Sequence, residues 1–162
     1  MQKLGRLGRH LDIGELAVLH ATMERRHITA GTVLLTAGQP NDSLFFVVKG
    51  ELLVSLPFET GPLFVGTRAS DSWVGEVSLL TLGVATANVT AARDSELLAI
   101  SAAGLAELTD SHPTVVSHFV RAISEDLAHR LRTADVGLAS APPAAPAGFF
   151  RRVFGGLFGD AQ

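Results

Sequence analysis

The chain has 162 residues, a formal net charge of −3 and a mean hydropathy of +0.32. This length favours one domain with a sizeable core, and the slightly acidic balance does not favour binding to a polyanion. No apolar run approaches the roughly 18 residues of a membrane span, and the absence of cysteine excludes disulfides, thiolate catalysis and Cys-based metal sites.

The N-terminal segment, residues 1–10, holds three Lys and Arg side chains, but no apolar stretch of the kind found in signal peptides follows it. We therefore predict no signal peptide and a cytoplasmic location. Asp12 and, three residues later, Glu15 have the spacing of a helix N-cap and its N3 partner. Leu16 and Leu19 then give this short predicted helix an apolar face.

Between about residues 24 and 100, short β-type runs alternate with turn signals, which is typical of a sandwich or barrel. The predicted strands are Thr32–Thr36, Leu44–Lys49, Glu51–Leu56, Leu63–Gly66, Ala87–Ala91 and Glu96–Ile100. Four glycines lie where tight turns between strands require a positive φ, namely Gly31, Gly38, Gly50 and Gly61. The pattern predicts a mainly β domain.

Beyond residue 100 the hydrophobic period becomes helical. Ser101 suits the N-cap of a helix to about Asp110, and Pro113 suits the first position of a longer helix capped by Ser111 or His112. One apolar stripe follows the longer helix: Val116, Val120, Ile123, Leu127, Leu131 and Ala134. Because the stripe is longer than a small β domain covers, we expect part of it to pair with a second copy in a homodimer.

The C-terminal segments differ in composition from the rest. Residues 139–148 are rich in Ala and Pro and predict an extended linker. On a helical wheel of residues 149–162, six apolar side chains lie opposite the arginines and glycines: Phe149, Phe150, Val153, Phe154, Leu157 and Phe158. Three interpretations stay open, which are docking on the chain's own β domain or in a dimer, docking in a groove of a partner protein, and binding to a membrane surface.

Two motifs in the β region point to a family. The stretch from Gly31 to Val54 contains a glycine, an apolar strand, a Gly-containing turn with an acid, and the run Leu-Phe-Phe-Val-Val-Lys-Gly; Gly75 to Leu80 reads Gly-Glu-Val-Ser-Leu-Leu. These resemble the first half and the phosphate-binding cassette of a cyclic nucleotide-binding domain, over about residues 10–135. The resemblance implies an eight-stranded jelly-roll β-roll (a double-stranded β-helix) with flanking helices, two of them at about 102–134, in a domain of residues 1–138.

The resemblance also implies a ligand site. In the family a cassette glutamate accepts the ribose 2′-hydroxyl, and an arginine nine residues later binds the cyclic phosphate. The corresponding residues here are Gly75, Glu76, Val77, Ala85, Thr86 and Ala87, so the glutamate is matched and the arginine is replaced by Ala85. A buried phosphate needs a neutralising cation. The replacement therefore predicts weak or lost binding of cyclic AMP and cyclic GMP.

A cation from another element would compensate for Ala85. In the family the end of the long helix can fold over the nucleotide as a lid, and His129, Arg130 and Arg132 lie at the matching position here. Arg93 is a poor candidate, because it belongs to the predicted turn between the last two strands. We expect no required cofactor, with a cyclic nucleotide as the candidate ligand.

These features favour a non-enzymatic regulatory protein whose tail determines its output, by recruitment to a larger assembly or a membrane surface. One alternative is a degenerate domain that binds no nucleotide and acts as an interaction or targeting scaffold. A cupin-like metal enzyme is the remote alternative, since no histidine lies between Thr32 and Ile100 to ligate a metal from the strands. About 28 residues follow Ala134 without a basic stripe, so we expect no nucleic-acid partner.

Overall fold

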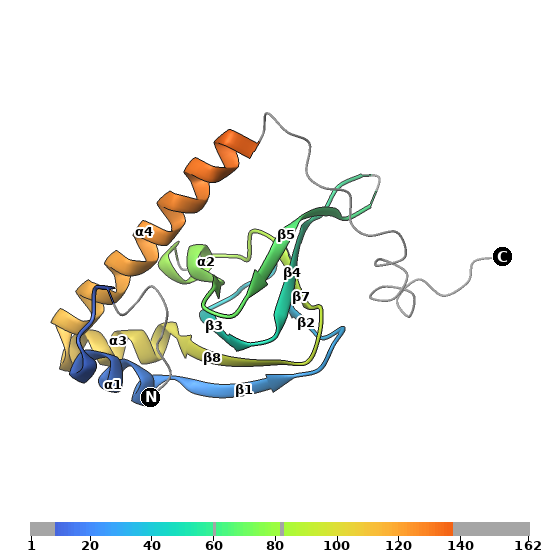
Figure 1. Ribbon diagram of the computed structural model, residues 1–162. Helices are drawn as coiled ribbons and strands as arrows, with labels where there is room; N and C mark the ends of the chain where they lie inside the picture. The colour runs from blue at the N-terminus through green and yellow to red at the C-terminus, as the bar shows by residue number, and fades with distance from the viewer. Residues whose placement is uncertain (1–8, 60, 82, 138–162) are drawn as a thin grey trace.

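Two four-stranded antiparallel sheets, wound into a β-roll, form the centre of the computed structural model, which describes residues 9–59, 61–81 and 83–137 (Figure 1). The first sheet has the order β1 (Glu24–Ile28), β8 (Ser95–Ser101), β3 (Ser43–Lys49), β6 (Trp73–Val74). The second has the order β2 (Val33–Leu35), β7 (Asn88–Ala91), β4 (Glu51–Leu56), β5 (Leu63–Ala69). The helices of the described residues are α1 (Ile13–Thr22), α2 (Glu76–Thr81), α3 (Ala102–Ser111) and α4 (Pro113–Gly137). The predicted jelly-roll fold with flanking helices is confirmed.

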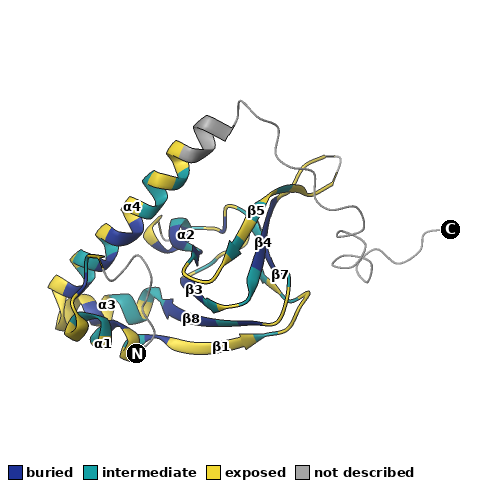
Figure 2. Cartoon of the chain, viewed as in Figure 1, coloured by how far each residue is buried: buried dark blue, intermediate teal, exposed yellow. Residues whose placement is uncertain are grey.

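Each of the six strands predicted from the sequence is present, with ends shifted by at most three residues. Two strands, β1 and β6, have no predicted counterpart among the runs. β1 reads Glu-Arg-Arg-His-Ile and its first four residues are exposed, as Figure 2 shows, because it is an edge strand. Such a strand lacks the apolar alternation that identifies a half-buried one. β6 has only two residues, which is too short for any periodicity.

Strand β3 is buried on both faces and joins two hydrophobic clusters. Its side chains alternate between the faces of the sheet, as in any strand. Phe45 and Val47 pack between the two sheets, in the same cluster as Leu52 of β4. Leu44 and Phe46 point the other way, into the cluster under the helices. The continuous apolar run therefore reflects a strand with core on both sides.

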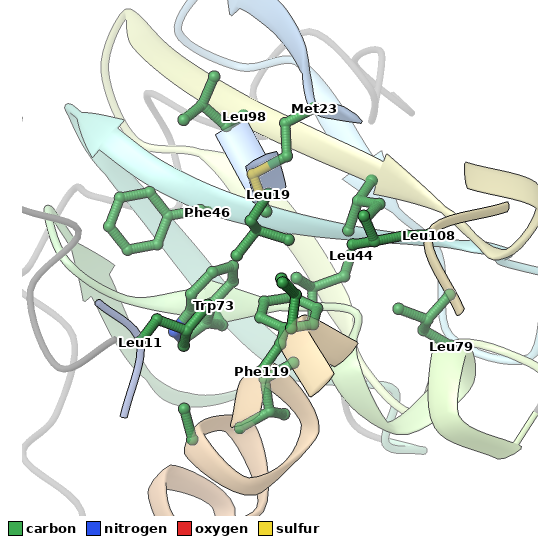
Figure 3. Packing of buried hydrophobic residues seen from close by; sticks show 14 residues of the cluster. Leu11, Leu19, Met23, Leu44, Phe46, Trp73, Leu79, Leu98, Leu108 and Phe119 are labelled. Atoms are coloured by element: carbon green, nitrogen blue, oxygen red, sulfur yellow. The ribbon is translucent and has the colours of Figure 1, made fainter. Parts of the chain in front are cut away.

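The single tryptophan, Trp73, links the β-roll to the helical layer (Figure 3). Its ring centroid lies 4.6 Å from that of Phe46 on β3 and 5.7 Å from that of Phe119 on α4. The contact with Phe119 is edge-on, at an interplanar angle of 71°, which is a favoured aromatic geometry. Phe119 is fully buried, so this contact fixes the first half of α4 against the sheet.

The face of α4 that packs on the core differs from the predicted stripe. Its buried residues recur at intervals of four, three and one: Val115, Phe119, Ala122 and Ile123. From the predicted stripe, Val116 and Leu127 pack only at the margin of this cluster. Leu131 is 67% exposed, because the helix extends past the β-roll at this point (Figure 1). The second half of the helix therefore presents an apolar side chain to solvent.

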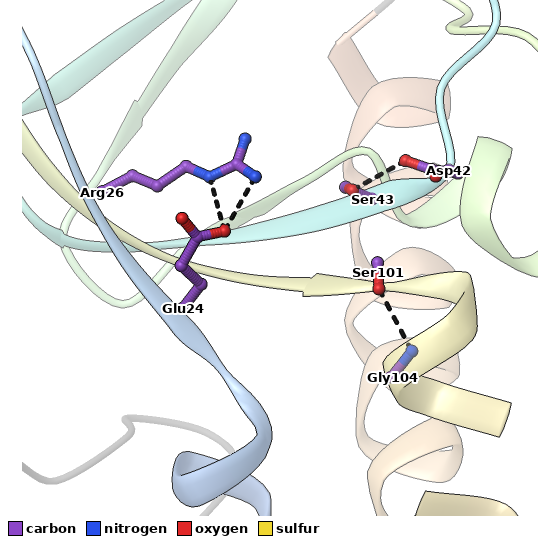
Figure 4. A network of polar contacts seen from close by, with 6 residues as sticks. All are labelled: Glu24, Arg26, Asp42, Ser43, Ser101 and Gly104. Atoms are coloured by element: carbon purple, nitrogen blue, oxygen red, sulfur yellow. Dashed lines mark hydrogen bonds and ion pairs between the residues drawn. The ribbon is translucent and has the colours of Figure 1, made fainter. Parts of the chain in front are cut away.

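The predicted helix starts are confirmed. Asp12 and Glu15 form a reciprocal capping box, in which the Glu15 N–H donates to the Asp12 carboxylate at 2.8 Å and the Asp12 N–H donates to the Glu15 carboxylate at 2.9 Å. The Ser101 hydroxyl accepts a hydrogen bond from the Gly104 N–H at 3.1 Å, as drawn in Figure 4, and caps α3. Pro113 is the first residue of α4. These ends follow from local chemistry alone.

The four turn glycines also have the expected backbone. Their φ angles are 85° at Gly31, 80° at Gly38, 106° at Gly50 and 115° at Gly61. Gly50, between β3 and β4, is further restricted by space, because a Cβ there would lie 2.7 Å from the Ser95 Cα. The predicted linker 139–148 and tail 149–162 lie outside the described residues.

Candidate functional site

A cavity of about 140 Å³ opens between the β-roll, α2 and α4. Its floor is apolar, because it consists largely of side chains from the cluster between the sheets. Its charged groups come from three separate elements: β5, α2 and α4. The lining residues are Leu35, Val54, Arg68, Val74, Gly75, Glu76, Val77, Ser78, Ala85, Thr86, Ala87, Val89 and Arg130.

The structure brings the six cassette candidates together in this cavity. Gly75 has a φ of 87°, and a Cβ there would lie 2.5 Å from the Ser43 carbonyl oxygen. Only glycine fits this turn into α2 without strain. The Asn41 side-chain amide donates to the Ser43 carbonyl and to the Ser78 hydroxyl, both at 2.7 Å. These contacts hold α2 against the turn that leads into β3.

Glu76, the first residue of α2, is the acidic group of the cavity. Its side chain is 8% exposed, and its Oε1 accepts a hydrogen bond from the Arg130 Nη2 at 2.5 Å. The Arg130 Nε lies 3.2 Å from the Asp126 Oδ2, one helical turn earlier on α4. Arg130 is therefore held between two carboxylates, and α4 is tied to α2 across the cavity mouth.

Ala85 lies in the loop before β7 and presents only a methyl group to the cavity. Its backbone is fixed by two hydrogen bonds at 2.8 Å, from its N–H to the Gln39 carbonyl and from the Gly38 N–H to its carbonyl. The side chain is 4% exposed. At the position where the resemblance places a phosphate-binding arginine, the site therefore has a buried methyl and no charge.

Arg68 is a cavity residue that the sequence reasoning missed. It lies on β5, opposite Leu52 of β4. The predicted strand ends at Gly66, whereas β5 continues to Ala69, because Thr67 to Ala69 pair in regular register with Glu51 to Leu53 of β4. The available signal was the spacing from Phe64 to Gly66 to Arg68, since residues two apart share a face of a strand. These three are the less exposed residues of β5.

The electrostatics of Arg68 differ from those of a surface arginine. Burial lowers the pKa of its guanidinium, and the neighbouring positive charge of Arg130 lowers it further, while Glu76 and Asp126 oppose both effects. Its Nη1 donates to the Thr67 carbonyl at 2.9 Å. Its Nε is buried and has no hydrogen-bond partner among the described residues. Unsatisfied buried donors are unfavourable, so this edge of the guanidinium would gain from an acceptor.

The three lid candidates are divided between two cavities. Arg130 reaches the cassette cavity. His129 and Arg132 instead line a second cavity of about 360 Å³ on the other side of α4, where the His10 ring contacts the Glu125 carboxylate at 2.9 Å. Arg93 pairs with Glu51, away from both cavities. The apolar tail residues Phe149 to Phe158 lie outside the described residues.

Two properties concern the described residues as a whole. Across residues 9–59, 61–81 and 83–137, the structure holds no group of three or more His, Cys, Asp and Glu side chains placed to bind a metal ion. Within the same ranges, no helix combines the length and the apolar character needed to cross a lipid bilayer.

The chain was compared with known proteins. An uncharacterised NTE family protein of Mycobacterium tuberculosis is 30% identical over 117 residues, which cover 72% of this chain and 20% of that protein. A cyclic nucleotide-gated potassium channel of Mesorhizobium japonicum is 32% identical over 97 residues, covering 60% and 26%. The chain thus spans a fifth to about a quarter of these relatives.

The similarity of the fold and the match to a family agree with these relatives. The crystal structure of the Thermus thermophilus catabolite activator protein superimposes with a TM-score of 0.71 at 26% identity, over 83% of this chain and 62% of that one. The family described as the cyclic nucleotide-binding domain matches residues 25–112, which is just over half of the chain. The chain belongs to the cyclic nucleotide-binding domain family.

Proposed function

We propose that this chain is a non-enzymatic regulatory domain that binds a cyclic nucleotide weakly in the cassette cavity. The observation that carries the proposal is that Glu76 and Ala85 line the same cavity, at the positions where the family resemblance places the ribose and phosphate ligands. The carboxylate is present and buried. The cation that would accompany it at residue 85 is absent.

Two features reduce the expected affinity. Removing one partner of a buried charge pair costs on the order of 2–5 kcal/mol, which corresponds to a loss of roughly thirty-fold to several thousand-fold. In addition, the Glu76 carboxylate is already paired with Arg130, so a ribose hydroxyl has to compete for it. A site of micromolar affinity would thereby weaken to about 100 μM or beyond.

The test is a titration of the protein with cyclic AMP and, separately, cyclic GMP, followed by amide NMR shifts to about 5 mM ligand, where weak binding is measurable. We expect dissociation constants above about 100 μM, and at least tenfold tighter binding by Ala85→Arg. Ala30→Arg adds the same charge at an exposed position outside the cavity and is the matched control. Absence of binding by both the natural chain and Ala85→Arg would refute a nucleotide site.

A second candidate function is an interaction scaffold without a small-molecule ligand. The observation that favours it is the Glu76–Arg130 ion pair, which satisfies the two charged groups without any nucleotide. In that case neither nucleotide would shift the amide signals of the cavity residues, and Ala85→Arg would restore nothing.

In both candidate functions, we propose that the C-terminal tail binds the downstream partner or membrane. The long helix α4 is proposed as a dimer surface. The tail proposal rests on the one-sided apolar pattern of Phe149 to Phe158, and the dimer proposal is supported by the exposure of Leu131. We place the protein in the cytoplasm, recruited by the tail to a larger assembly or a membrane surface.

A further inference from the structure

The cassette cavity keeps two cationic side chains in spite of Ala85. Three of its lining residues are ionisable: Arg68, Glu76 and Arg130. Both nearby carboxylates, Glu76 and Asp126, pair with Arg130. Arg68 is thus the lining cation for which the described residues provide no carboxylate partner within ion-pair distance, and a cyclic phosphodiester, which has one negative charge, is an anion of the class that it would bind.

The donors of Arg68 are arranged so that one edge of the guanidinium is committed and another is not. The Nη1 donates to the carbonyl of Thr67. Within the part of the chain that the structure describes, the buried Nε has no hydrogen-bond partner. A guanidinium can present two adjacent N–H groups to two oxygens of a phosphate, and this geometry is specific to arginine.

The strand around Arg68 gives the guanidinium room. A Cβ added to Gly66, two residues earlier on the same face of β5, would have the Arg68 Nη1 as its nearest neighbour at 3.8 Å. Leu52, which pairs with Arg68 across the strands, is fully buried. Arg68 therefore extends from a paired strand of the β-roll, whereas Arg130 extends from the second half of α4. The two cations reach the cavity from different elements.

We propose that Arg68 is the residue that neutralises the phosphate of a bound cyclic mononucleotide, in place of the arginine that is absent at position 85. This inference rests on the proposed function and specifies which residue gives the site its remaining affinity. When a phosphate binds, its oxygens accept from the free Nε edge of Arg68. Arg130 stays with Glu76 and Asp126 and closes the cavity from α4.

The test compares Arg68→Gln, Arg68→Lys and the natural chain in the same amide NMR titration with cyclic AMP. We expect Arg68→Gln to weaken binding at least tenfold, because it removes the charge and the fork. The affinity of Arg68→Lys should lie between those of the natural chain and Arg68→Gln, because lysine keeps the charge but lacks the two adjacent N–H donors of the guanidinium. Arg93→Gln removes an exposed arginine outside the cavity and should bind like the natural chain.

Thermal melts separate ligand binding from a structural role. Without ligand, Arg68→Gln should melt at or above the temperature of the natural chain, since it removes a buried donor that lacks a partner. With nucleotide in excess, the natural chain should gain stability and Arg68→Gln should not. A structural role for Arg68 would instead lower the melting temperature of the ligand-free variant.

The outcomes distinguish the two proposals. If Arg68→Gln binds as tightly as the natural chain, the role of Arg68 is refuted and the nucleotide site stands. If only Ala85→Arg binds and the natural chain does not, Arg68 does not substitute for the cassette arginine and the inference is again refuted. If neither binds, both the inference and the nucleotide site are refuted.

Discussion

Arg130 on α4 and Glu76 at the start of α2 are 54 residues apart in sequence and form an ion pair with an N–O distance of 2.5 Å. The pair connects the element that shapes the cassette to the helix that covers it. In Figure 1, α2 lies between α4 and the strands, so the ion pair ties the second half of α4 to the cassette. This tie adds to the packing of Phe119 that holds the first half of the helix.

The first prediction concerns this ion pair. Arg130→Gln should lower the free energy of unfolding by about 2 kcal/mol, because the Glu76 carboxylate then stays buried without its cation. Glu76→Gln should cost less, since Arg130 keeps Asp126 as a partner. Urea denaturation of both single variants and the double variant gives the coupling energy. Strictly additive effects would mean that the two side chains do not interact in solution.

The second prediction concerns the aromatic contact between the β-roll and α4. Phe119→Ala should lower the free energy of unfolding by about 3–5 kcal/mol, because it leaves a cavity beside Trp73. Trp73 is the only tryptophan, so its fluorescence reports on this layer directly. Phe58→Ala, at a side chain that is 65% exposed, is the matched control and should change stability by less than about 0.5 kcal/mol. Equal effects of the two substitutions would contradict the packing.

The parts of this fold that the sequence predicts are those set by local chemistry. The capping box of Asp12 and Glu15, the Ser101 cap and the turn glycines each depend on neighbours within a few residues. Strand β1 is not predicted from the sequence, because an edge strand with exposed polar residues lacks the alternation of apolar and polar side chains.

The candidate site divides in the same way. The sequence identifies the cassette, because it is a contiguous motif followed by a loop nine residues later. It does not identify Arg68, because glycine is unfavourable inside a strand and the predicted strand therefore ends at Gly66. β5 continues because the residues after Gly66 pair with β4, and this pairing depends on the partner strand rather than on local sequence. The pairing of Arg130 with Glu76 likewise depends on where α4 packs.

The third prediction is that the chain dimerises through the second half of α4. Leu131 is 67% exposed, and an apolar side chain on a helix that extends past its own core is a suitable contact for a second copy. Light scattering at about 100 μM should give twice the monomer mass of 17.0 kDa. Leu131→Glu should give the monomer mass, whereas Ile13→Glu, at a residue that is 72% exposed on α1, should not. A monomer mass for the natural chain would refute the dimer.

The fourth prediction concerns the tail. On a helical wheel of residues 149–158, Phe154 falls within the predicted apolar side. Burying that side yields about 25 cal/mol per Å², and ordering the segment opposes it, so the association should be reversible and sensitive to one charge. Phe154→Asp should abolish recruitment of the protein in cells, measured with a fluorescent fusion, and leave the melting temperature unchanged. A melting temperature lowered by several degrees would indicate that the tail docks on its own β-roll instead.

The fifth prediction separates two glycines that share a backbone conformation. Gly38 and Gly75 have φ angles of 80° and 87°, so alanine at either position should cost about 1–2 kcal/mol of backbone strain. At Gly38 a Cβ would meet nothing within 4 Å, and strain is the whole effect. At Gly75 the Cβ would lie 2.5 Å from the Ser43 carbonyl and 3.1 Å from the Asn41 amide nitrogen, so the turn into α2 has to move. We therefore expect Gly75→Ala to cost at least about twice as much as Gly38→Ala in urea denaturation.

The displacement should also shift the amide signals of Glu76 and Ser78, whereas Gly38→Ala should leave them in place. Equal losses of stability for the two variants would mean that the close approach of Gly75 to Ser43 does not hold the cassette.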